Sequence, residues 1–225
     1  MSRTVRIMLV SLLSLAAVPA WAQGAYFGVG VGRAQAADAS SNSRNLADQV
    51  CAAAYGAGAS GCAVSLKYDE SANGFSAFAG MQLSPYLAGE VGYVDLGTYS
   101  LRANFVLTSG GTTSIASATE EDKASAAYFA AVFSYPVTRR VALLGKLGLA
   151  YTRLKESCTV SVAPCSSGSD TGWQPTFGLG VDVSLVANVD LRVSYTQFNN
   201  VGDANNQYAA GDFRYAEIAG IVHFP

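Results

Sequence analysis

The sequence has few charged residues, one histidine and, after residue 22, no long apolar run. Only 13% of its 225 residues are charged, and the formal net charge is −2. A nucleic-acid-binding protein needs a basic face, so this balance excludes nucleic acid as a partner. No later segment has the roughly 20 apolar residues of a spanning helix. A membrane protein with this sequence would therefore be a closed β-barrel, because only helices and closed barrels satisfy their backbone hydrogen bonds in lipid.

The first 22 residues have the pattern of an export signal. Arg3 and Arg6 are basic, and the apolar run at residues 7–18 is too short to span a membrane. The sequence Ala20-Trp21-Ala22 fits an A-x-A cleavage site. We predict a cleaved signal peptide at residues 1–22 and one domain at residues 23–225. The alternative, a retained helical anchor, is disfavoured by the short run and the cleavage pattern.

Cysteine and histidine are too few and too widely spaced for a metal centre. The four cysteines form no C-x-x-C pair, and His223 lies far from all of them. A zinc site needs such ligands at short spacing, so we predict no metal and no cofactor. An even cysteine count in an exported chain indicates disulfides, in three possible pairings. The short separations favour Cys51 with Cys62 and Cys158 with Cys165.

The rest of the chain alternates large apolar residues with small or polar ones. In residues 173–203, Phe177, Leu179 and Val181 alternate with Gly178 and Gly180, as in a strand with two unlike faces. Eight such strands are expected, at residues 25–34, 74–83, 87–96, 126–135, 141–153, 173–183, 189–198 and 214–224. Residues 99–107 are expected to extend the third strand. Connections are long after odd-numbered strands and short after even-numbered ones, as in outer-membrane barrels.

We therefore predict an all-β fold, an eight-stranded antiparallel up-and-down transmembrane β-barrel in the cell outer membrane. The competing fold is a soluble eight-stranded ligand carrier, which would expose its polar face. Gly28, Gly30, Gly80 and Gly178 lie on that face. Small side chains suit the crowded interior of a narrow barrel and gain nothing on a solvated exterior. Interface aromatics are expected at the periplasmic rim (Tyr26, Tyr86, Tyr135, Phe224) and at the outer rim (Phe75, Tyr151, Trp173, Phe198, Tyr215).

Two patterns that can carry chemistry lack the necessary context. The G-x-G-x-x-G at residues 56–61 would bind a dinucleotide only at a strand-to-helix turn. It lies between two cysteines, and we interpret it as a glycine-rich loop. A lipid-modifying enzyme needs a nucleophile beside a base. His223 lies near the chain end, and no serine in the first or seventh predicted strand has an evident basic partner. We predict that the chain is not an enzyme.

Several segments resemble the transmembrane barrel domain of the OmpA-like outer membrane proteins. They are Gly80-Met-Gln-Leu-Ser-Pro-Tyr86, Ala88-Gly-Glu-Val-Gly-Tyr93, Ser134-Tyr-Pro-Val-Thr138, Lys146-Leu-Gly148 and residues 191–203. The resemblance implies an eight-stranded barrel whose lumen is crossed by paired charges at Glu90, Lys146, Asp182 and Arg192. It also implies a lysine four residues before the turn proline, where this chain has Val132. Many relatives continue into a peptidoglycan-binding domain, which we do not expect in a chain ending at Pro225.

The predicted role is structural or surface-interacting. Buried charges persist when paired, and an eight-stranded barrel encloses little space, so we expect the charge network to plug the lumen. The alternative is a narrow porin-like channel for small solutes. Expected partners are outer-membrane lipid and, through the long external loops, a host, phage or cell-surface partner.

Overall fold

A computed structural model describes residues 24–37, 51–52, 60–160, 167–201 and 211–224. The described chain forms strands β1 (Ala25–Ala36), β2 (Gly61–Tyr68), β3 (Ser71–Ser84), β4 (Leu87–Ser109), β5 (Thr112–Pro136), β6 (Val141–Val160), β7 (Gly168–Val186), β8 (Val189–Val201) and β9 (Gly211–Phe224). Among these residues no helix is long and apolar enough to cross a membrane.

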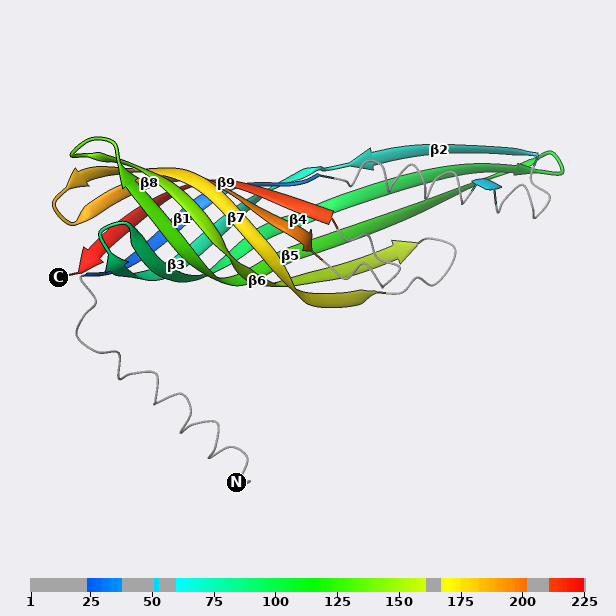
Figure 1. Cartoon of the computed structure of the whole chain (residues 1–225). Helices are drawn as coiled ribbons and strands as arrows, with labels where there is room; N and C mark the ends of the chain where they lie inside the picture. Colours follow the sequence, from blue (N-terminus) through cyan, green and yellow to red (C-terminus); the bar gives the residue numbers. More distant parts are fainter. Residues whose placement is uncertain (1–23, 38–50, 53–59, 161–166, 202–210, 225) are drawn as a thin grey trace, which may run out of the picture.

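Eight of these strands close into a barrel. β4, β3, β1, β9, β8, β7, β6 and β5 are hydrogen-bonded in that order, and pairing of β5 with β4 completes the ring. All neighbouring pairs are antiparallel, so the predicted up-and-down barrel is confirmed. The short turns after β3, β5 and β7 lie at one rim, with the end of β9, and the turn between β4 and β5 lies on the opposite side (Figure 1).

β2 lies outside this ring, and no strand was predicted at these residues from the sequence. It pairs with the outer part of β4, from Cys62 opposite Leu107 to Tyr68 opposite Leu101. β3 begins only at Ser71, so the outer part of β4 would otherwise be an unpaired edge, which proteins usually cover. The prediction of a loop throughout this connection is therefore wrong for Gly61–Tyr68.

The β4–β5 hairpin, with β2 beside β4, projects far beyond the other strands (Figure 1). Its turn at Gly110 and Gly111 has positive φ at both residues, 56° and 80°, which glycine adopts without strain. From Tyr93 to Ser109 the strand spans about 50 Å at a strand rise of about 3.3 Å per residue. The predicted extension of this strand is thus present, and its partner β5 is extended equally.

A bulge at Gly97 sets which face of the extension points inward. The β4–β5 register shifts between Asp95 and Gly97, and Gly97 has a φ of 87°. Before the bulge the even-numbered Val94 and Leu96 are buried; beyond it the odd-numbered Tyr99 is buried. An extra residue in one strand of a pair reverses the alternation in this way.

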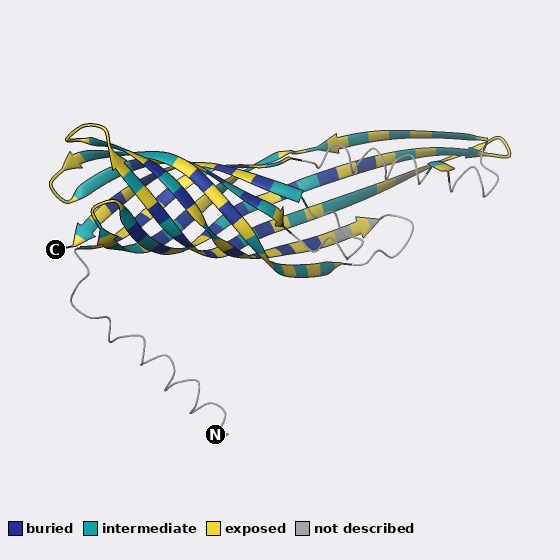
Figure 2. Ribbon diagram, in the orientation of Figure 1, coloured by how far each residue is buried: buried dark blue, intermediate teal, exposed yellow. Residues whose placement is uncertain are grey.

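Apolar side chains cover the outside of the barrel and small or polar ones fill the inside. Leu179 is 72% exposed, whereas its neighbours on the other face point inward, and buried and exposed residues alternate along each strand (Figure 2). At the outer rim, Trp173 packs against Phe129 and Tyr151, with ring centroids 6.0 and 5.4 Å apart. An exposed apolar belt bordered by aromatics is what a lipid-facing surface requires.

Three aromatic residues expected in the interface belts point into the barrel instead. Tyr26 is 4% exposed, and Phe198 and Tyr215 are each 1% exposed. Each lies two residues from an inward-facing residue of its own strand, namely Gly28, Thr196 and Glu217. Residues two apart in a strand share a face, so these three side chains also point inward. The belt assignment was wrong for these three, because it used only their position near a strand end.

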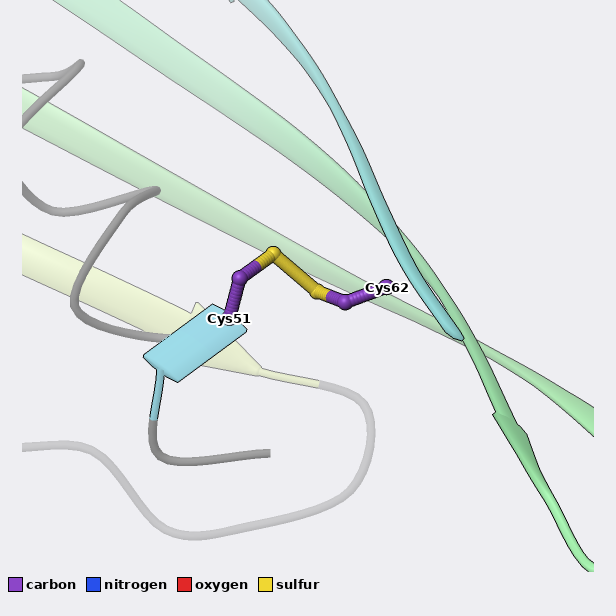
Figure 3. The surroundings of a disulfide bond; sticks show 2 residues. All are labelled: Cys51 and Cys62. Atoms are coloured by element: carbon purple, nitrogen blue, oxygen red, sulfur yellow. A yellow bond between two sulfur atoms is a disulfide. The ribbon is translucent and has the colours of Figure 1, made fainter. Parts of the chain in front are cut away.

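One of the two predicted disulfides is present. Cys51 and Cys62 are bonded, and they join the segment before β2 to the start of β2 (Figure 3). Cys165 lies outside the described residues, so its pairing with Cys158 stays a prediction.

Replacing both Cys51 and Cys62 by serine is expected to leave barrel assembly intact, since neither residue lies in the closed ring. The loss should be local, on the order of 2–3 kcal/mol for a loop this short. Limited proteolysis should show faster cleavage before β2, while folded and boiled forms still migrate differently on a gel. A variant that no longer assembles, or peptide mapping that links Cys51 or Cys62 to the other pair, would contradict this account.

Candidate functional site

Four strands each contribute one charged side chain to a single level of the lumen. Glu90 comes from β4, Lys146 from β6, Asp182 from β7 and Arg192 from β8. Alternation along each strand directs all four side chains inward. Asp182 and Arg192 are also direct cross-strand partners, which places them side by side.

Glu90 is the centre of this lumen network. Its oxygens lie 2.7 Å from Lys146 Nζ and 2.7 Å from Arg192 Nη1, and its side chain has no exposed surface. The Arg192 guanidinium continues to Asp182, donating from Nε and Nη2 over 2.8 and 3.0 Å. Two carboxylates and two cations thus neutralise one another, and the bidentate pair fixes the orientation of Arg192.

Two tyrosines complete the hydrogen bonding of Glu90. Tyr26 and Tyr128 donate their hydroxyl protons to its two oxygens over 3.0 and 2.9 Å. Sequence reasoning missed both residues, although each alternates with inward-facing neighbours. A buried carboxylate needs its acceptor sites filled as well as its charge neutralised, so these bonds stabilise the network.

Inward-facing glycines make room for these rings. A Cβ added at Gly80 would overlap the Tyr26 ring, and one at Gly92 would lie 2.7 Å from Tyr128 Cζ. The glycine face that favoured a membrane barrel over a soluble one therefore has a specific use, because it lets large side chains cross a narrow lumen.

Two small cavities border the network, and a larger one opens on the periplasmic side. Two small cavities bordered by Lys146 have volumes of about 10 Å³ each, room for about one water molecule. A third cavity, of about 250 Å³, opens at the rim of short turns and is lined by Asp182 and Arg192 among others. We call this cavity the periplasmic vestibule. His223 lies there, with Nε2 2.9 Å from Asp190 Oδ2.

A second carboxylate level lies outward of the first. Glu217 on β9 is 5% exposed and accepts hydrogen bonds from the hydroxyls of Ser76 and Ser194. The sequence pattern placed Glu217 on the inward face, but gave no reason to select it. Its partners come from β3 and β8, which only the closed ring brings together.

The chain is similar to known outer-membrane barrels in sequence and in fold. Residues 20–224 match the family of OmpA-like transmembrane domains. Outer membrane protein A of Salmonella typhi is 29% identical over 132 residues, 59% of this chain and 34% of that protein. That of Klebsiella aerogenes is 30% identical over 135 residues, 60% and 34% of the two chains. This chain thus spans about a third of the length of these relatives.

A solved structure supports the fold. Neisserial surface protein A matches with a TM-score of 0.54 and 16% identity, over 89% of this chain and 97% of that one. At a sequence identity this low, the match supports a shared fold alone. The family match covers the whole barrel, with the charged lumen residues inside it. The chain therefore belongs to the OmpA-like transmembrane domain family and is a β-barrel of the outer membrane.

Proposed function

We propose that this protein is a non-conducting outer-membrane barrel that holds a rigid interaction surface above the membrane. The observation that carries the proposal is the lumen network. Four charged side chains from four strands meet at one level, and at most 15% of any of them is exposed. Hydrated ions would have to separate these pairs to pass, and buried pairs are costly to separate.

The projecting hairpin supports the interaction role. β4 and β5 pair continuously as far as Ser109 and Thr112, and the exposed side chains near the tip include Val106 and Ile115, 38% and 75% exposed. Long structured loops on a rigid scaffold commonly carry binding function. A partner on another cell, a host surface or a phage would meet this hairpin first.

A small-solute channel is the second candidate, and the periplasmic vestibule favours it. Its volume of about 250 Å³ reaches Arg192 and Asp182 from the periplasmic rim, so the lumen is open on that side as far as the network. An enzymatic role has less support, because His223 faces Asp190 rather than a nucleophile.

Liposome swelling with small sugars distinguishes these functions. Vesicles containing the wild-type barrel should swell no faster than empty vesicles, whereas vesicles with an open porin should swell rapidly. The folded state is checked on a gel, where unboiled and boiled samples should migrate differently. Swelling that depends on sugar size would replace the closed barrel by the channel.

A further inference from the structure

Three carboxylates meet on the inner face of the barrel extension, beyond the aromatic belt. Glu120 and Asp122 lie on β5 and Glu156 on β6, and one oxygen from each lies within 4.8 Å of the others. We call them the outer carboxylate cluster. Asp122 and Glu156 are direct cross-strand partners, five residues beyond Ala127 and Tyr151 at the level of Trp173. Like charges placed directly opposite each other in a sheet destabilise it.

No cation of the described chain balances this cluster. The five ion pairs formed by the described residues include none of its members. Lys123 and Lys155 are adjacent in sequence, but alternation turns them to the exposed outer face. Asp170, from β7, adds a further negative charge beside Glu156.

The carboxylates are also short of hydrogen bonds. Asp122 Oδ1 is buried with no hydrogen-bond partner. Glu156 is 7% exposed, and within the part of the chain that the structure describes no hydrogen bond or ion pair reaches its carboxylate. Buried polar atoms normally have partners, so such a group indicates a ligand or an ion.

Burial and the neighbouring carboxylates make the charged forms unfavourable. Burial first, and then the charge of Glu120, raise the pKa of Asp122 to about 7. Burial and the charges of Asp122, Glu120 and Asp170 raise the pKa of Glu156 to about 7. Three carboxylates at this spacing repel one another, and a bound cation would offset that repulsion.

We propose that the outer carboxylate cluster binds a calcium ion and thereby ties β5 to β6 above the membrane. Calcium prefers carboxylate oxygens at about 2.3–2.6 Å, so two ligands on opposite sides of the ion lie about 5 Å apart. The observed spacing fits this limit without movement of the strands. Magnesium requires about 2.0–2.1 Å and near-octahedral geometry, which fits this spacing less well.

The spacing of cysteine and histidine in the sequence gave no reason to expect a metal site. Asp122 and Glu156 are far apart in sequence and become neighbours only through strand register. The proposal is independent of whether the lumen conducts, because the cluster lies outward of the lumen network.

Calcium titration of the refolded chain in detergent tests the proposal. Isothermal titration calorimetry at pH 7.5 should show one saturable site with a Kd of about 10⁻⁴–10⁻³ M, the range of extracellular calcium modules. Terbium provides a second probe, since Tyr99 is the direct cross-strand partner of Asp122 and can sensitise the luminescence of a bound ion.

The matched variants are Asp122→Asn with Glu156→Gln, and the control Glu121→Gln. Glu121 is exposed on the outer face between two members of the cluster. The double variant should weaken calcium binding by about tenfold or more, comparable to the loss of metal-site ligands or their supports. The control should bind like the wild type. Absence of saturable binding to the wild type, or equal binding by the double variant, would overturn the proposal and leave a proton-sharing cluster.

Discussion

Replacing Arg192 by alanine is expected to lower the free energy of unfolding by about 3–5 kcal/mol, the usual cost of removing one member of a buried ion pair. Arg192 bridges Glu90 and Asp182, so its loss leaves Asp182 without a cation and Glu90 with Lys146 alone. Lysine at this position should recover part of the loss, because it keeps the charge but cannot form the bidentate pair. Urea titration in detergent measures the difference.

The control for Arg192 is Arg214→Ala, which removes an exposed arginine from β9. It should change the free energy of unfolding by less than about 0.5 kcal/mol, as for most surface substitutions. Equal stability of the two alanine variants would show that the lumen network does not contribute to stability.

Val132→Lys offers a rescue of the alanine variant. Val132 is 2% exposed, faces the lumen and is the cross-strand partner of Lys146. A lysine there would restore a second cation at the position where relatives are expected to have one. The double change Arg192→Ala with Val132→Lys should recover part of the lost stability. If it is less stable than Arg192→Ala alone, the added charge does not reach the carboxylates.

Gly148→Ala is the second substitution with a large expected effect. A Cβ at Gly148 would overlap the backbone oxygen of Phe129 and lie 2.7 Å from the Ala130 Cβ. Backbone atoms in a sheet cannot move aside easily, so we expect a loss of about 1–3 kcal/mol, as for other overpacked interiors. The fraction of heat-modifiable protein after refolding and the urea midpoint both report this loss.

Gly145→Ala is the matched control on the same strand. No heavy atom lies within 4 Å of a Cβ added at Gly145, which faces outward. Glycine in a strand interior weakens the strand, so alanine here should be neutral or slightly stabilising. If Gly148→Ala refolds and unfolds like Gly145→Ala, the close packing of the glycine face is not what limits the inward side chains.

Most of the fold could be predicted from the alternation of apolar and polar residues along the strands. This alternation placed the eight barrel strands, and it put Glu90, Lys146, Asp182 and Arg192 on inward faces. β2 was not predicted, although Val64, Leu66 and Tyr68 alternate with Ser65 and Lys67, because it lies outside the eight-stranded ring and pairs only with the outer part of β4.

The details of the two carboxylate sites depend on ring closure and strand register. Tyr26 and Tyr128 reach Glu90 from β1 and β5, and Asp122 meets Glu156 only through the β5–β6 register. The bulge at Gly97 also changes which residues of β4 face inward, from even-numbered to odd-numbered ones, and simple alternation does not predict this change. Such contacts join residues far apart in sequence, so no local pattern indicates them.

The most direct test of the closed lumen is single-channel conductance in planar bilayers, with the wild type compared with Arg192→Ala. The wild type should insert without discrete current steps. Arg192→Ala should give small steps, because the largest side chain of the network is gone and the periplasmic vestibule then extends further into the lumen. Steps of equal size in both proteins, or none in the variant although it is folded, would contradict a lumen closed by this network.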